Sequence, residues 1–280
     1  MKLGLVLEGG AMRGMYTAGV LDVLLDGQLE VQGVIGVSAG AVFGVNFLSR
    51  QRGRVIRYNK RYNGDKEYMG VRQLLKTGNL VSTDFAYGTV PRELDPFDDE
   101  TFQACGVPFY AGVTSLDSGR IEYVQIKSVL EQMDVLRASA SMPFLSRPVE
   151  LHGKRYLDGG VADSIPYQKM LELGYDRLIV VLTRDRSYVK APVPAAAVKL
   201  WYGRYRGFSQ ALLHRHEEYA RSVRQLEVLE QLGAAFVFRP SEPITIGRME
   251  KDPEKLQAVY ELGIADGRRG MAALKEFLER

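Results

Sequence analysis

The chain has 280 residues, of which 46% are hydrophobic and 25% are charged, with a formal net charge of +3. This length suits one large α/β domain with a further helical part, and so small a charge is not typical of a nucleic-acid-binding protein. The single cysteine, Cys105, excludes an intrachain disulfide and a metal site made of cysteine pairs, so we expect no metal and no cofactor. No apolar run approaches the length of a membrane span and the first residues do not resemble a signal peptide, which predicts a cytoplasmic protein.

The first expected strand, residues 3–7, leads into a glycine-rich turn and then a helix over about residues 15–25. Such a turn presents backbone N–H groups and the positive end of the helix dipole to one point. The glycines fit neither the dinucleotide fingerprint nor the nucleotide phosphate loop. Two interpretations stay open: a tight turn for helix–strand packing, or an oxyanion hole with Arg13 beside it. The turn reads Glu8-Gly9-Gly10-Ala11-Met12-Arg13-Gly14.

A second buried strand ends in a G-x-S-x-G motif centred on Ser38, and a small apolar helix over about residues 41–48 follows. Strand, sharp turn and helix are the setting of a nucleophile elbow, in which the serine hydroxyl projects from the carboxyl end of the strand. Gly36 and Gly40 lack the Cβ atoms that would collide in this turn. A glycine-rich turn with a capping serine is the alternative interpretation of the motif alone.

The middle of the chain carries weaker signals. Residues 50–76 are basic with interleaved tyrosines, and fit either a surface for anionic lipid headgroups or a solvated helix face. Residues 91–100 are acidic and are expected to form a loop. A hairpin is expected over about residues 108–126, and Ser128 begins a capping box that predicts a helix to about Ala138.

Asp158 ends a further short strand and is followed by Gly159 and Gly160. Because Asp-Gly is a common turn pair, an ordinary hairpin turn is the alternative to a carboxylate held near Ser38. The apolar run over residues 177–183 reads as a fully buried strand, as in a parallel sheet.

Beyond residue 190 the composition changes. We expect residues 1–190 to form a catalytic α/β domain and residues 191–280 a mainly helical region packed on it. Aromatic and basic residues around Trp201 fit either a membrane interface or a helix packed on the core. A long amphipathic helix over about residues 208–232, a strand over residues 235–238 and a closing helix are expected to follow.

A serine nucleophile needs a base, and the usual base is histidine. The three histidines, His152, His214 and His216, lie outside any motif. Asp158 is left as a base that acts directly on Ser38. A carboxylate is a weak base at neutral pH unless its environment raises its pKa, so this pair would depend on its positioning and on an oxyanion hole.

Together these motifs resemble those of the patatin-like phospholipase family, lipid acyl hydrolases that use a Ser–Asp dyad. The family's oxyanion loop G-G-G-x-R-G corresponds to residues 9–14, its elbow to residues 36–40 and its D-G-[GA] motif to residues 158–160. The similarity covers about residues 3–185, and the last 90 residues carry no family motif.

The resemblance implies a three-layer α/β/α fold with a mainly parallel central sheet and a helical C-terminal extension. It implies Ser38 as nucleophile and Asp158 as base. One departure is Ala11 in place of the third loop glycine, and we expect the oxyanion hole to survive if Ala11 does not adopt a positive φ. The resemblance assigns the oxyanion hole to Gly9, Gly10 and Ala11, and supporting roles to Arg13, Gly14, Gly36, Gly40, Gly159 and Gly160.

The activity implied is that of a phospholipase, lysophospholipase or carboxylesterase, with a lipid or acyl ester as substrate. Two alternatives stay open: an acyltransferase that uses the same acyl-enzyme, and a non-catalytic lipid-binding relative. No nucleic acid is expected as a partner, and peripheral contact with a membrane is an open interpretation of the basic stretches.

Overall fold

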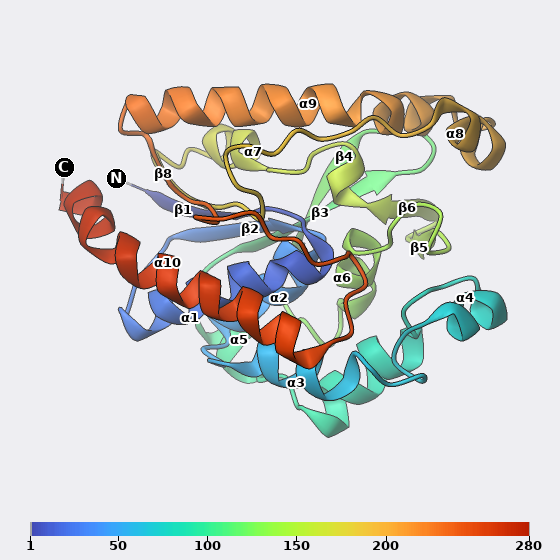
Figure 1. Ribbon diagram of the computed structural model, residues 1–280, viewed down its shortest axis with the longest axis horizontal. Helices are drawn as coiled ribbons and strands as arrows, with labels where there is room; N and C mark the ends of the chain where they lie inside the picture. Colours follow the sequence, from blue (N-terminus) through green and yellow to red (C-terminus); the bar gives the residue numbers. More distant parts are fainter. Residues whose placement is uncertain (1, 280) are drawn as a thin grey trace.

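Within residues 2–279, which the computed structural model describes, eight strands form one sheet (Figure 1). The main path runs β5-β6-β3-β2-β1-β7-β8, and β4 pairs with β3. Strands β3, β2, β1, β7 and β8 are parallel, and the other three are antiparallel to their neighbours. The strands are β1 (Leu3–Leu7), β2 (Gly33–Val37), β3 (Phe109–Ser115), β4 (Ile121–Ile126), β5 (Val149–Leu151), β6 (Lys154–Asp158), β7 (Arg177–Val181) and β8 (Ala235–Phe238).

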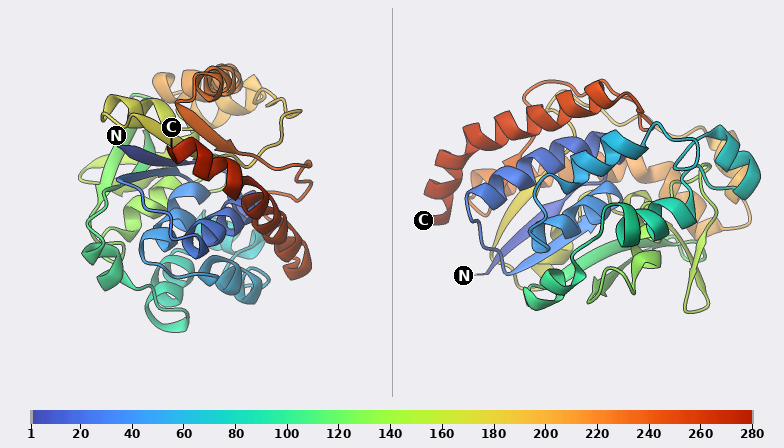
Figure 2. Two further views of the ribbon diagram at one scale, coloured as in Figure 1. Left: turned by 90° about the vertical axis from the view of Figure 1, so that its left-hand side faces the viewer. Right: turned by 90° about the horizontal axis from the view of Figure 1, so that it is seen from below.

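Helices cover both faces of this sheet (Figures 1 and 2). The layer below the sheet in Figure 1 includes α1, α2, α3 and α10, and the layer above it includes α7 and α9. The expected three-layer α/β/α architecture with a mainly parallel sheet is therefore confirmed. The helices are α1 (Gly14–Asp26), α2 (Ala39–Leu48), α3 (Arg54–Tyr62), α4 (Val71–Thr77), α5 (Asp99–Ala104), α6 (Met133–Ser139), α7 (Tyr167–Glu172), α8 (Ala195–Tyr202), α9 (Arg206–Gln231) and α10 (Pro253–Glu279), with 3-10 helices η1 (Ala11–Arg13) and η3 (Gly159–Val161) and a π-helix η2 (Phe85–Leu94).

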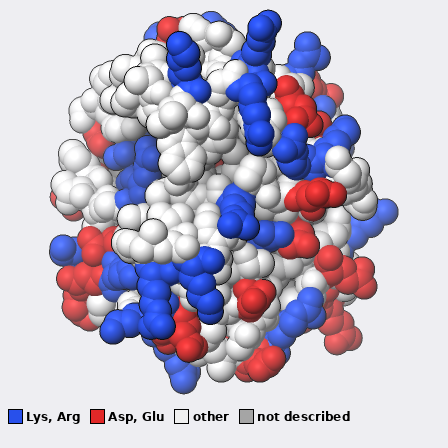
Figure 3. All heavy atoms as spheres, turned by 90° about the vertical axis from the view of Figure 1, so that its right-hand side faces the viewer, with Lys and Arg blue, Asp and Glu red and all other residues white. Residues whose placement is uncertain are grey.

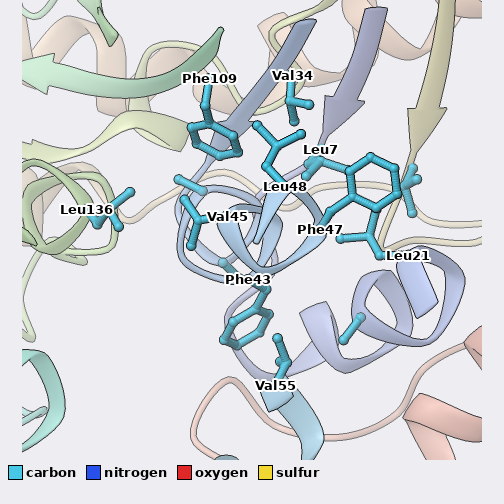
Figure 4. Close-up of a cluster of buried hydrophobic side chains, with 14 of the residues drawn as sticks. Leu7, Leu21, Val34, Phe43, Val45, Phe47, Leu48, Val55, Phe109 and Leu136 are labelled. Carbon is cyan, nitrogen blue, oxygen red and sulfur yellow. The ribbon is translucent and has the colours of Figure 1, made fainter. Parts of the chain in front are cut away.

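The alternation of side chains along the strands divides the core between the two layers. Leu5 and Leu7 of β1 belong to the cluster that contains α1, α2 and α10, whereas Val6 belongs to the cluster under α7 and α9. Figure 4 shows the first cluster, in which Phe43 and Phe47 of α2 lie among strand and helix side chains. Because both faces of the parallel strands are buried, these strands read in sequence as continuous apolar runs.

One edge of β3 is shared by two strands, and this brings distant parts of the chain together. On that edge β2 pairs with the first half of β3, ending with Val37 opposite Gly112. The second half pairs with β6, so that Asp158 lies opposite Val113. Strand β4 takes the other edge over the same residues. The ends of β2 and β6 therefore meet head to head, which places the residue after Val37 beside Asp158.

Two local expectations are wrong. The helix predicted from Ser128 begins at Met133, because Asp99 accepts hydrogen bonds from the Ser128 hydroxyl (2.6 Å) and the Val129 N–H (2.7 Å) and holds this segment away from helical geometry. Residues 91–94, expected in a loop, instead end the π-helix η2. Arg57 binds the carboxylate of Asp95 at 2.8 Å and ties this end to α3.

The C-terminal region contributes to both the sheet and a helical layer. Strand β8 pairs with β7, and α10 packs along α1. The two helices approach so closely that a Cβ at Gly19 would collide with the backbone of α10, and one at Gly263 with the backbone of α1. The division at residue 190 stays a prediction about folding units. Among residues 2–279, none of the helices has the length and apolar character needed to cross a bilayer.

Candidate active site

Ser38 lies in a sharp turn between β2 and α2, with φ 56° and ψ −124°. A positive φ is strained for a residue with a side chain, and such strain is concentrated at functional sites. A Cβ at Gly36 would overlap the backbone of Gly40, and one at Gly40 would overlap the carbonyl group of Leu7. The two glycines are therefore required by close backbone contacts, which is the geometry of a nucleophile elbow.

The structure brings Ser38 and Asp158 together, although 120 positions separate them in the sequence. The Ser38 hydroxyl donates a hydrogen bond of 2.6 Å to Asp158 Oδ2, and the other carboxylate oxygen accepts one of 2.8 Å from the Gly160 N–H. This second bond fixes the carboxylate orientation at the start of η3. A Cβ at Gly159 would collide with the Gly112 carbonyl, which explains the glycine that follows Asp158.

A third polar residue, Ser139 at the end of α6, positions the elbow. Its hydroxyl accepts a hydrogen bond of 2.9 Å from the Ser38 N–H and donates one of 2.7 Å to the Gly112 carbonyl. The sequence reasoning assigned Ser139 no role. The only signal was its place in the Ala138–Phe144 segment, which resembles the family without a stated function.

The environment of Asp158 strengthens it as a base. Burial raises the pKa of Asp158 above its usual value, and Arg215, the Ser38 hydroxyl, the Gly160 N–H and Lys190 partly offset this shift. A carboxylate with a raised pKa accepts a proton more readily at neutral pH. Burial thus gives Asp158 the raised pKa that a carboxylate needs if it is to act as a base without a histidine.

The histidines lie elsewhere. His152 is exposed in the β5–β6 turn, His214 pairs with Glu217, and His216 contacts the Leu213 carbonyl. No histidine of the described chain lines either pocket that contains Ser38. This placement agrees with the interpretation that the three histidines have no part in the site.

The glycine-rich loop lies directly against the serine, since a Cβ at Gly9 would come within 3.1 Å of the Ser38 Cβ. The Gly9 N–H already donates to the Ser164 carbonyl at 3.3 Å. Within residues 2–279, the N–H groups of Gly10 and Ala11 have no hydrogen-bond acceptor. Ala11 has φ 48°, so the condition that it avoid a positive φ is not met, although its N–H group keeps no acceptor and stays free to donate within residues 2–279. Ala11 therefore begins the 3-10 turn η1 in a conformation that is strained for a residue with a Cβ.

Two pockets meet at Ser38. One is mostly apolar and lies between α2, η2 and α6, with Val42, Val90 and Leu136 among its lining residues. The other is polar and includes Asp158, the glycine-rich loop, and cationic side chains from segments beyond β7. Sequence reasoning missed those cations, because each comes from a segment without a motif. Nowhere in the described chain do three or more His, Cys, Asp or Glu side chains come together as metal ligands would.

The family model described as "Patatin-like phospholipase" matches residues 5–171, which is more than half of the chain. The chain belongs to the patatin-like phospholipase family. Membership in this family places the chain among lipid hydrolases in general. Residues 205–279 match a second model, described as a domain of unknown function, DUF6363.

Several relatives of this patatin-like chain are known by sequence or structure. The uncharacterized protein YjjU of Escherichia coli K12 is 28% identical over 99% of this chain and 79% of its own length. A lysophospholipase nte1 of Aspergillus fumigatus is 26% identical over 98% of this chain, which spans only 18% of that protein. The crystal structure of VipD from Legionella pneumophila aligns with a TM-score of 0.48 and 13% identity, covering 97% of this chain and 67% of VipD.

Proposed function

We propose that this protein is a serine lipid acyl hydrolase, a phospholipase, lysophospholipase or carboxylesterase, that acts through a Ser38–Asp158 dyad. The observation that supports this most directly is the 2.6 Å hydrogen bond from the Ser38 hydroxyl to Asp158 at the mouth of an apolar pocket. A buried carboxylate with a raised pKa next to a strained serine is an arrangement suited to nucleophilic catalysis.

The reaction proceeds in two halves. The Ser38 oxygen attacks the ester carbonyl while Asp158 accepts its proton, and the oxygen of the tetrahedral intermediate becomes negative. The intermediate collapses to the acyl-enzyme, and Asp158 returns the proton to the departing alcohol. Water then attacks the acyl-enzyme, giving its proton to Asp158, and the proton returns to Ser38 as the fatty acid leaves.

The N–H groups of Gly10 and Ala11 are the best donors for the negative oxygen, because they lie beside Ser38 without acceptors of their own. Ala39 at the first position of α2 is a further candidate. Gly9 takes a smaller part than the sequence resemblance implied, since its N–H is bonded to Ser164. One such donor is worth about 3–4 kcal/mol of transition-state stabilisation.

The apolar pocket receives the acyl chain. Burial raises the pKa of Tyr58, one of its lining residues, to about 12, so this hydroxyl stays neutral at physiological pH. Most of the pocket wall is apolar, and an apolar wall favours hydrocarbon over a charged group. The opposite side of Ser38 is then left for the alcohol part of the ester.

Reaction with a fluorophosphonate probe, followed by hydrolysis assays with acyl esters, tests the nucleophile. Wild type and a Ser241→Ala control, at an exposed serine outside both pockets, should be labelled and active. Ser38→Ala should be folded, unlabelled and inactive. Labelling and full activity of Ser38→Ala would refute the dyad.

The two alternatives give different results in the same assays. An acyltransferase would be labelled at Ser38 but would form a new ester when an alcohol is added in place of water. A non-catalytic lipid-binding protein would bind acyl esters without labelling or turnover.

We also propose peripheral membrane contact through the end of the molecule at which the parallel strands finish. Leu75 of α4 is 83% exposed, and Leu200 and Trp201 of α8 are 82% and 60% exposed. Both helices lie at the right-hand end in Figure 1, and Figure 3 shows broad uncharged areas there bordered by Lys and Arg side chains. Apolar side chains flanked by cations suit the surface of an anionic bilayer. The cytoplasmic location stays a prediction from the sequence.

Co-sedimentation with anionic vesicles tests this surface. The double variant Leu75→Asp, Trp201→Asp should lose most vesicle binding, whereas Leu232→Asp, at a similarly exposed leucine on another part of the surface, should retain it. Equal binding by both variants would refute the assigned surface.

A further inference from the structure

The polar pocket beside Ser38 contains more cations than the proposed reaction uses. Five of its lining residues are basic and two are acidic, Glu8 and Asp158. The basic residues come from η1, from the segment after β7, from α9 and from the segment before α10. They are Arg13, Arg184, Lys190, Arg215 and Arg248, and we call them the cation cluster.

No member of the cation cluster pairs with a carboxylate within residues 2–279, where every ion pair joins other groups. The Nε atoms of Arg13 and Arg215 are buried and have no hydrogen-bond partner there. Burial and repulsion from Arg184 lower the pKa of Arg13 to about 10, and burial together with Arg215 lowers the pKa of Lys190 well below its usual value. Grouped, partly desolvated and unpaired cations are costly unless an anion completes the site.

The shape and position of this pocket suit a phosphoryl group. The pocket volume is about 90 Å³, which is several times the volume that one water molecule needs. Arginine forks bind phosphate oxygens in pairs, and the cation cluster contains four arginines. Because the acyl chain occupies the apolar pocket, an anion here would belong to the alcohol side of the same ester.

The pocket offers little to a positively charged headgroup. A quaternary ammonium is usually held by open aromatic faces or by carboxylates. Here Arg184 lies 3.8 Å from the ring centre of Tyr188, and Lys190 lies 4.0 Å from that of Tyr219. Glu8 accepts hydrogen bonds from Thr183, and Asp158 accepts from Ser38, so both acids are engaged.

We propose that the cation cluster binds the phosphoryl group of an acyl ester whose headgroup carries no balancing positive charge, a class represented by monoacylglycerol phosphate. The choice of an ester rests on the proposed function, whereas the binding of the phosphoryl group does not require turnover. Arg184 and Arg248 set this preference from outside the dyad, because neither forms a hydrogen bond with Ser38 or Asp158.

A specificity ratio tests the proposal. We compare kcat/KM for monoacylglycerol phosphate with kcat/KM for monoacylglycerol of the same chain length, both as monomers. Wild type should prefer the phosphate ester, and Arg184→Gln with Arg248→Gln should lower the ratio about tenfold to hundredfold. The control Arg186→Gln with Arg268→Gln removes the same charge at residues outside the pocket and should keep the wild-type ratio. A ratio unchanged in the cluster variant would overturn the proposal.

Two binding measurements separate the outcomes. Titration of Ser38→Ala with monoacylglycerol phosphate and with inorganic phosphate should show binding that the cluster variant weakens, even if no ester is hydrolysed and the proposed function fails. Hydrolysis of the neutral ester without binding of either phosphate compound would leave the function and overturn the inference.

The same titration identifies the source of the phosphoryl group. Binding of the lipid at least tenfold tighter than inorganic phosphate supports a lipid headgroup, whereas equal affinities would overturn the lipid assignment in favour of free phosphate. Equal affinity for a monoacylglycerol phosphocholine would overturn the proposal that the headgroup carries no positive charge to balance the phosphoryl group.

Discussion

The two sides of Ser38 are built by different parts of the chain. The apolar side comes from α2, η2 and α6, all within residues 5–171, which match the family model. The polar side takes four of its five cations from residues 184–248, beyond that match. The part shared with the family supplies the proposed nucleophile and most of the wall of the proposed acyl pocket. The part beyond it supplies charge, and with it the proposed choice of headgroup.

The largest effect should come from Asp158, which accepts the hydrogen bond of Ser38, the residue that lines both pockets. Asp158→Asn should lower kcat/KM about a thousandfold or more, because amide nitrogen and oxygen cannot take the serine proton. Stability should rise. Burial raises the pKa of Asp158 in the folded protein above its value in the unfolded chain. The stability linked to this shift is present only below the unfolded pKa and is lost as the pH rises, so ionised Asp158 destabilises the fold at pH 7.

Steady-state kinetics and thermal melts at pH 7 check both parts of this prediction. The control is Asp117→Asn, at an exposed aspartate paired with Arg155. Full activity of Asp158→Asn would point to a different base, and a lower melting temperature would contradict the cost of burying the carboxylate.

The apolar pocket can be shortened by a substitution that leaves the polar pocket unchanged. Ala86→Phe, in η2, places a ring in the pocket and displaces about four methylenes of a long chain, for a loss near 3 kcal/mol, or about a hundredfold in kcat/KM. Acetyl esters should be cleaved at nearly the wild-type rate. Equal losses for long and short esters would show that the acyl chain does not enter this pocket.

A residue of the polar pocket should affect the pKa of Asp158 as well as the binding of the headgroup. Arg215 lowers the pKa of Asp158, so Arg215→Gln should raise that pKa and move the acid limb of kcat/KM to higher pH. The profile is measured on a neutral ester, which separates this effect from headgroup binding. Arg215→Lys should restore much of the wild-type profile, and Arg221→Gln, an exposed control on the same helix, should leave it in place. An acid limb that does not move would exclude this coupling.

The smallest effect is expected in the loop between the two sides. Ala11→Gly relieves a positive φ that disfavours residues with a Cβ, and should raise the free energy of unfolding by about 0.5–1 kcal/mol, since the added chain freedom offsets part of the gain. Activity should be retained, because the backbone N–H is unchanged. Urea denaturation measures the difference, and a destabilised variant would show that the alanine methyl group contributes packing.

The contrast between the two sides of Ser38 also explains which residues of the site could be predicted from the sequence. Ser38 was found because a nucleophile elbow is a local structure, written in five consecutive residues with glycines at fixed positions. Asp158 was reached by excluding the histidines and by its own short motif. Apart from Arg13, the cation cluster has no local pattern, since its other members lie outside any motif and are brought together only by the packing of the segment after β7, α9 and the segment before α10.

The prediction of where α6 begins was wrong for a similar reason. The capping box at Ser128 is a correct local signal, and Ser128 does accept a hydrogen bond from the Glu131 N–H at 3.2 Å. The carboxylate of Asp99, 29 positions earlier, competes for the same segment and delays the helix. Long-range hydrogen bonds of this kind cannot be read from a window of neighbouring residues.

The shared edge of β3 makes the molecule modular. Val37, which precedes Ser38, and Asp158 pair with the same strand, at Gly112 and Val113, so the separation of Ser38 and Asp158 depends little on the segments that connect them. Much of the wall of the acyl pocket lies in the connecting segment before β3, in α3 and η2. Exchange of that segment for one of another length or shape should change the fatty acid that the proposed pocket accepts, while β3 keeps Ser38 and Asp158 in place.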